Sequence, residues 1–206
     1  MIQLYGLPMS NYYSLIKALL IEKGLEFEEV AAPPTQKPDN LERSPMGKMP
    51  SIGVDGRYLS ESLAIAAYLE RLTPEPALLP SDPFEAGKVM ELVCHMKLDV
   101  ELVARRCLPE AFFGQTVSEE TKESTRADLE RGMAAVARIY QGAPYAVGDR
   151  LSLADFYTFY TFGLAGGITE KIFGIDLLEG HDNIRGVMQR MAEHPSVARV
   201  EAEKAG

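Results

Sequence analysis

Ser10 is the first residue whose type and position suggest chemistry. It follows the short apolar segment 1–5 and precedes residues whose apolar side chains have helical spacing. A serine at a helix start either caps the helix through its side-chain oxygen or donates a hydrogen bond to an anion at the positive helix end. No base partner can be identified for Ser10, which alone would be a poor nucleophile. We therefore favour a role in which Ser10 stabilises a bound anion, namely a thiolate, over a role in covalent attack.

A second candidate anion site lies at Ser60-Glu61-Ser62, where another helix is expected to begin. Free backbone N–H groups and the helix dipole favour a negative charge there. The Ser62 hydroxyl is a further donor, and the Glu61 carboxylate can accept a hydrogen bond from an ammonium group. The pair would suit a ligand end that carries both charges, as an amino acid does. The alternative is that Ser60 or Ser62 only caps the helix.

The stretch SPMGKMPSI, residues 44–52, places two prolines around a glycine just before an expected strand. Pro50 lies at the first residues of that strand, where its missing N–H costs least. If the Met49–Pro50 bond is cis, a fixed turn leaves the N–H and C=O of Met49 facing outward. An exposed main-chain edge of this kind can pair with an extended peptide. The alternative is an ordinary turn with a trans proline.

The elements that must position these residues are expected to form a small mixed sheet with helices on its faces. A β-α-β unit implies one parallel strand pair, and Asp55-Gly56 indicates an antiparallel hairpin after it. The proline-rich stretch 32–40 breaks the pattern. Apolar spacing predicts strands at 1–5, 27–30, 49–54 and 57–60 and helices at 11–23 and 61–72.

A proline-rich linker, residues 75–83, separates this first domain, residues 1–74, from the remainder. No strand period is found after the linker, and the apolar residues follow helical spacing. Residues 84–206 are therefore expected to form an all-helical domain.

One helix start in this second domain is unusually clear. Ser152 and Asp155 have the spacing of a capping box, for which we expect a structural role. The uncharged run 156–169 that follows is shorter than the about 20 residues of a bilayer span, so it is expected to be the buried central helix.

Composition and charge exclude several functional classes. A net charge of −9 argues against binding nucleic acid or an anionic membrane. The two cysteines, Cys94 and Cys107, form neither a CxxC nor a zinc spacing, so we expect no metal and no disulfide. This cysteine usage fits a reducing cytoplasm, and no basic segment of the kind that begins a secretory leader precedes residue 16.

These features together resemble the glutathione transferase family over the whole length of the chain. SPMGKMP is similar to that family's loop ending in a cis-proline, and Glu61-Ser62 is similar to its γ-glutamyl-binding pair. GDRLSLADF and MAEHPSVARV resemble its capping-box segment and its C-terminal helix end. The resemblance implies an α/β thioredoxin-like N-terminal domain, an all-α helical-bundle C-terminal domain and a homodimer.

The resemblance also implies how glutathione, the co-substrate, would bind. Its cysteinyl amide would pair with the backbone of Met49 next to Pro50. Glu61 and Ser62 would hold its γ-glutamyl end.

The same resemblance ranks the groups that would act on the thiol. Ser10 is ranked first because its position is similar to that used by the serine- and cysteine-using branches. Tyr5 is second and Tyr12 third, since other members use a tyrosine near the end of the first strand. The glycine carboxylate of glutathione would meet Lys37 or Lys48.

The sequence gives little indication of which residues form the electrophile pocket. Candidates on the long helix of the second domain are His95, Asp99, Arg105 and Phe112, although a lone histidine is more often a surface or packed residue.

The leading hypothesis is a detoxification enzyme that adds glutathione to a small hydrophobic electrophile. Family members with isomerase, dehalogenase or peroxidase activity have the same first domain, so the fold does not distinguish among these activities. One alternative is a non-catalytic interaction protein or stress regulator of the same fold. Another is a thiol–disulfide oxidoreductase, which the absence of cysteine around Ser10 disfavours.

Overall fold

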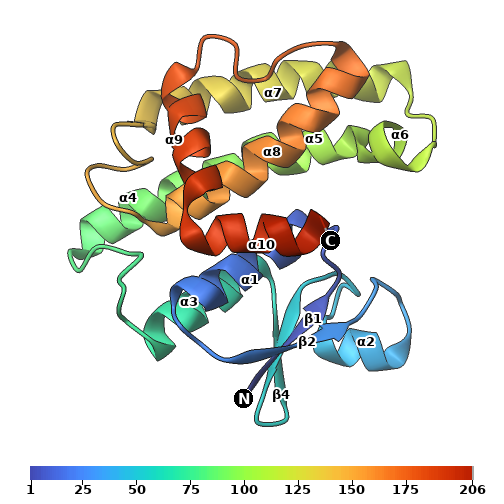
Figure 1. Ribbon diagram of the computed structural model, residues 1–206. Coiled ribbons are helices and arrows are strands. Elements are labelled where there is room, and N and C mark those ends of the chain that lie inside the picture. The colour runs from blue at the N-terminus through green and yellow to red at the C-terminus, as the bar shows by residue number, and fades with distance from the viewer. Residues whose placement is uncertain (206) are drawn as a thin grey trace. The chain divides into compact units, whose positions relative to one another are not determined.

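The computed structural model describes residues 1–205, which fall into two compact units. The first unit contains residues 1–78 together with the segment from Glu193 onward, and the second contains residues 79–192. The segment after Glu193, whose helical pattern suggests the second domain, therefore clusters with the first unit. Figure 1 labels most of the helices and strands of both units.

The first unit is built on a four-stranded sheet with the order β2-β1-β3-β4. Strands β1 and β2 are parallel, whereas β1–β3 and β3–β4 are antiparallel. The expected mixed sheet with helices, a thioredoxin-like arrangement, is confirmed. Its elements are β1 (Ile2–Gly6), α1 (Asn11–Glu22), β2 (Phe27–Ala31), α2 (Pro38–Arg43), β3 (Ser51–Val54), β4 (Arg57–Ser60), α3 (Ser62–Leu72) and α10 (Pro195–Ala205).

Helix α2 differs from the sequence-based expectation, which placed only an irregular stretch before residue 40. The helix forms because Pro38 occupies its first turn, where the missing N–H costs no intrahelical hydrogen bond. Asp39 in the first turn and Arg43 in the last complement the helix dipole. A proline-rich composition therefore hides a helix start here.

Helix α1 is largely buried within the first unit. It contacts β1, α3 and α10 (Figure 1). Packing on more than one side explains why its apolar residues do not form a single stripe. Its fully buried apolar side chains are Leu15, Ile16, Ala18, Leu19 and Leu20.

The second unit is helical throughout its regular elements. The long helix α8 contacts α4 and α6, and its Phe156, Tyr157 and Phe162 are fully buried. Among residues 1–205, no helix combines the length and the apolar character needed to cross a bilayer. The elements are α4 (Pro83–Cys94), a π-helical segment (His95–Glu101), α5 (Leu102–Ala104), a 3₁₀ turn (Arg105–Cys107), α6 (Leu108–Phe113), α7 (Glu119–Ile139), α8 (Leu153–Phe173) and α9 (Asp182–Glu193).

Asp155 anchors the start of α8. Its side chain is fully buried, and Ser152 and Asp155 form a capping box. The backbone N–H of Ser152 donates to Oδ2 at 2.8 Å, and that of Ala146 donates to Oδ1 at 2.7 Å. One carboxylate thus joins the helix start to the preceding loop.

We expect Asp155→Ala to lower the free energy of unfolding by about 3 kcal/mol, because two buried N–H groups lose their acceptor. Urea unfolding followed by circular dichroism would measure this change. Asp149→Ala, which removes an exposed carboxylate from the same loop, should change the value by no more than about 0.5 kcal/mol. Equal stability of the two variants would contradict the anchoring role.

Candidate functional site

The three stretches singled out in the sequence lie at the same end of the sheet. In the antiparallel register, Tyr5 near the end of β1 pairs with Ser51, the first residue of β3. Ser51 pairs on its other side with Ser60, the last residue of β4. The loop after β1, the loop before β3 and the connection after β4 therefore leave adjacent strands at one end. This register brings segments far apart in the sequence to one place.

The loop before β3 is held by hydrogen bonds to its own first residue and to the segment before α2. The N–H of Gly47 donates to the carbonyl of Ser44 at 2.7 Å, and the N–H of Thr35 donates to the carbonyl of Gly47 at 3.0 Å. The Asn40 side chain of α2 donates to the carbonyl of Thr35 at 2.8 Å. Sequence reasoning missed these supporting residues because none of them forms a recognisable motif.

Gly47 is required by both its conformation and its surroundings. Its φ of +64° lies in the left-handed region that favours glycine. A Cβ atom there would lie only 2.4 Å from the Thr35 carbonyl oxygen. The glycine between the two prolines is therefore needed for the close contact between the two segments.

Met49 presents the main-chain groups expected of a peptide-binding edge. The Met49–Pro50 peptide bond is cis, so the alternative of a trans proline does not hold. The paired region of β3 starts only at Ser51. Within residues 1–205, neither the N–H nor the C=O of Met49 has a hydrogen-bond partner. One N–H and one C=O can pair with a residue of an extended peptide.

Glu61 has an unusual backbone conformation at the junction of β4 and α3. Its φ of 72° and ψ of 120° are rare for a residue other than glycine. Such strain is found preferentially at binding sites. Glu61 is exposed, whereas Ser62, the first residue of α3, is buried. The positive end of α3 thus lies at the same end of the sheet as Met49.

Ser10 caps α1 and keeps a donor available. The backbone N–H of Tyr13 donates to Ser10 Oγ at 3.3 Å, and the Ser10 side chain is half-buried. Within the described part of the chain, its hydroxyl hydrogen has no acceptor. The capping and donating roles proposed from the sequence are compatible, because one uses the oxygen lone pair and the other uses the hydrogen.

The two candidate tyrosines are placed differently from Ser10. Tyr5 lies on the same face of β1 as Gln3, and its hydroxyl donates to Gln3 Oε1 at 2.8 Å. Burial, followed by the neighbouring Tyr58, raises the pKa of Tyr5 above its ordinary value, although Arg43 opposes the shift. Tyr12 is half-buried on α1. The Tyr5 phenol is therefore kept protonated and is already bonded.

The two candidate lysines are both exposed. Lys37 precedes α2 as its N-cap residue, and Lys48 lies beside Met49 in the loop. Within residues 1–205 neither ammonium group forms an ion pair or a hydrogen bond. Both are therefore free to meet a carboxylate.

The electrophile-pocket candidates of the second unit are bound to near neighbours. His95 Nδ1 lies 2.7 Å from Asp99 Oδ2. Arg105 donates to the buried Glu101 at 2.8 Å. The Lys171 ammonium lies 4.0 Å from the centre of the Phe112 ring.

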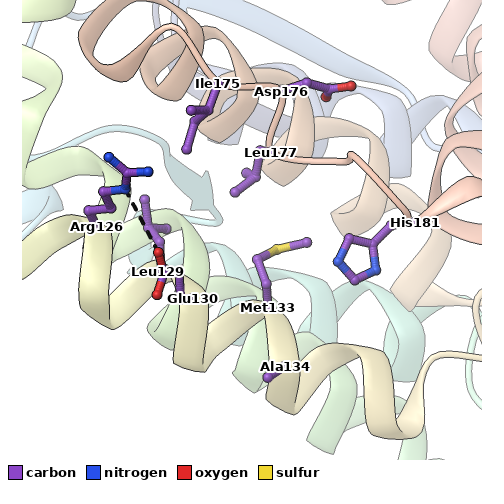
Figure 2. A pocket seen from close by; sticks show the side chains of 9 residues that line it. All are labelled: Arg126, Leu129, Glu130, Met133, Ala134, Ile175, Asp176, Leu177 and His181. Carbon is purple, nitrogen blue, oxygen red and sulfur yellow. Dashed lines mark ion pairs between the residues drawn. The ribbon is translucent and has the colours of Figure 1, made fainter.

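Two cavities of the second unit show how these candidates are distributed. One, of about 340 Å³, is lined by Asp99 but not by the other three candidates. The other, of about 350 Å³, lies between α7 and the loop that follows α8 and is shown in Figure 2. None of the four candidates lines the second cavity. Its lining residues are Arg126, Leu129, Glu130, Met133, Ala134, Ile175, Asp176, Leu177 and His181.

The chain matches two family descriptions along most of its length. Residues 4–77 match "Glutathione S-transferase, N-terminal domain" and residues 108–204 match "Glutathione S-transferase, C-terminal domain". A glutathione S-transferase of Pseudomonas putida is 42% identical over 204 residues, which cover 99% of this chain and 93% of the relative.

Solved structures with related folds contain glutathione or a derivative of it. A glutathione S-transferase of Methylobacterium radiotolerans in complex with glutathione sulfonate is 25% identical, with a TM-score of 0.79, covering 97% of this chain and 93% of that chain. A maleylacetoacetate isomerase of Anaeromyxobacter dehalogenans with glutathione bound in its active site is 26% identical, with a TM-score of 0.74, covering 97% and 94% respectively.

We expect Gly47→Ala to lower the free energy of unfolding by about 2 kcal/mol, through backbone strain and the contact with Thr35. Gly56→Ala is the matched control, because Gly56 has a φ of +75° but no atom within 4 Å of a Cβ. It should lose only about 1 kcal/mol, from backbone strain alone. Urea unfolding would measure both variants. Equal losses would show that the contact with Thr35 does not hold the loop.

Proposed function

Because the chain belongs to the glutathione S-transferase family, we propose that it binds glutathione as a thiolate and transfers it to an electrophilic small molecule. The observation that carries the proposal is the register of β1, β3 and β4, which gathers Ser10, Met49 and Glu61 at one end of the sheet. An open main-chain edge, a helix start with a hydroxyl donor and a second helix start are the groups that an acidic, thiol-containing tripeptide requires.

Glutathione would lie extended across this end of the sheet. Its cysteinyl N–H and C=O would pair with the main chain of Met49, whose own groups have no partner within residues 1–205. The γ-glutamyl carboxylate would lie at the positive end of α3 beside Ser62, and its ammonium group would face the Glu61 carboxylate. The glycine carboxylate would meet Lys37 or Lys48.

Ser10 would act on the sulfur. Its hydroxyl hydrogen would be donated to the thiolate, and the dipole of α1 would add to the stabilisation. A free thiol has a pKa of about 8.5, so a decrease of about two units would make the thiolate the main form at neutral pH. Tyr5 ranks below Ser10 because its hydroxyl is already donated to Gln3. Tyr12 ranks third.

The thiolate would then attack an electrophilic carbon and form a carbon–sulfur bond. In a transfer reaction this bond is kept, and either a leaving group departs or a proton is taken up. In an isomerisation the addition is reversed, and glutathione is released unchanged. Because the chain resembles a maleylacetoacetate isomerase, we propose that the site could support either transfer or isomerisation.

We further propose that the protein works as a cytoplasmic homodimer. Exposed Leu98 and Leu102 lie four residues apart on one helical stretch, beside the cavity lined by Leu98 and Asp99. Apolar side chains at such a position suit the surface of a second copy.

Titration calorimetry with glutathione tests the binding site directly. The wild-type chain should bind, and Ser62→Ala should raise the dissociation constant about tenfold, because a hydrogen bond to a charged group is lost. Ser81→Ala, at an exposed position in the linker, should leave the constant unchanged. Absence of binding by the wild-type chain would instead favour a non-catalytic interaction protein.

Ser10→Ala should lower kcat with an activated aryl halide by at least about tenfold, which corresponds to about 1.4 kcal/mol, while glutathione affinity changes little. The ultraviolet absorbance of the thiolate should also show a higher pKa for bound glutathione. Ser10→Asp retains an N-cap acceptor but has no hydrogen to donate, so it should also be slow. Normal turnover in both variants, with a loss in Tyr5→Phe, would transfer the role to Tyr5.

A further inference from the structure

Lys17 is a buried cation that the proposed chemistry does not use. Its side chain is 7% exposed, and its Nζ lies 2.7 Å from Glu29 Oε1 and 2.6 Å from Glu203 Oε2. These three residues belong to α1, β2 and α10. Glu203 also accepts from Arg199 Nε at 2.8 Å, so each carboxylate is held by at least one cation.

Tyr13 connects this ion cluster to the candidate catalytic serine. Its side chain is buried, and its hydroxyl donates to the second oxygen of Glu29. Its backbone N–H donates to Ser10 Oγ at 3.3 Å. A Cβ atom on Gly6 would lie 2.5 Å from Tyr13 Cδ2, so the ring is packed tightly against the end of β1. Tyr13 therefore joins Glu29, through its hydroxyl, to Ser10, through its backbone N–H in the first turn of α1.

The ammonium group at the centre of the cluster is buried, whereas the two carboxylates that hold it are each 40% exposed. Loss of one partner from a buried ion pair leaves an uncompensated charge, so the remaining groups rearrange. Burial and the hydrogen bond to Glu29 raise the pKa of Tyr13, which keeps its hydroxyl a donor. Hydrogen bonds from Arg199 and Lys17 lower the pKa of Glu203, which keeps it ionised.

Helix α10 is tied to α1 at a second point. His194, just before α10, lies 3.6 Å from Glu22 at the end of α1. The pairs 22–194 and 17–203 show that the two helices run in opposite directions. Figure 1 shows α10 lying beside α1. The end of α10 therefore points toward the start of α1.

We propose that Tyr13, Glu29, Lys17 and Glu203 form a positioning network through which the C-terminal helix orients Ser10. The proposal rests on the proposed function of Ser10. With its oxygen lone pair held by the Tyr13 N–H, the serine directs its hydrogen away from the helix, toward the position of the thiol. In this proposal the four residues act through Ser10 and not by direct contact with glutathione.

Glu203→Gln and Tyr13→Phe test the network. Each should lower kcat with the aryl halide about threefold to tenfold and change the KM for glutathione less than twofold. A smaller fraction of folded protein would also lower the apparent kcat and leave KM unchanged, so the pKa of bound glutathione, followed by its thiolate absorbance, is the distinguishing measurement. Both variants should raise that pKa, which a smaller folded fraction would not change. Glu201→Gln is the matched control on the same helix, because its partner Lys204 lies on α10 itself, and it should leave both constants unchanged. Glu203→Gln keeps the test valid if Tyr13→Phe fails to fold, since the Glu203 side chain is 40% exposed.

The decisive measurement places the same changes in the Ser10→Ala background. Glu203→Gln and Tyr13→Phe should lower kcat no further there, because the group that they position has been removed. An equal fold-loss in both backgrounds would overturn the network. Loss of activity in Ser10→Ala with none in the network variants would overturn the network alone. Unchanged activity in Ser10→Ala would overturn both the role of Ser10 and the network that depends on it.

Discussion

The pairing of Tyr5 with Ser51 and of Ser51 with Ser60 is the constraint on which the candidate site depends. A shift by one residue would turn every side chain of β3 to the opposite face of the sheet. Buried Ile52, which pairs with Leu4, opposes such a shift because it would have to leave the core. The hydrophobic pattern of the core therefore determines where the polar groups of the site meet.

In the loop of the candidate site, main-chain groups that form hydrogen bonds lie beside main-chain groups that have no partner. Thr35, Ser44 and Gly47 hold one another through hydrogen bonds, whereas Met49, only two residues later, has no partner within the part of the chain described. These unpaired groups of Met49 are the ones to which the proposed function assigns the main chain of glutathione.

Features that depend on neighbouring residues could be predicted from the sequence, and features that depend on distant residues could not. The cap formed by Ser10 and the capping box around Asp155 follow from spacings of three residues, and the structure contains both. The mixed sheet followed from the alternation of strands and helices. In contrast, Lys17 and Glu203 lie far apart in the sequence, and no local pattern indicates their ion pair. The second-domain candidates were chosen by residue type alone, and only Asp99 among them lines a described cavity.

The membership of α10 in the first unit has a consequence for synthesis on the ribosome. Val197 and Val200 of α10 are buried, and the helix packs on α1. When residues 1–78 have been synthesised, the more than one hundred residues that precede α10 have still to be translated. During that interval, the face of α1 that packs against α10 stays exposed. The first unit to emerge is thus among the last to be completed, and premature termination would leave an apolar surface available to chaperones and proteases.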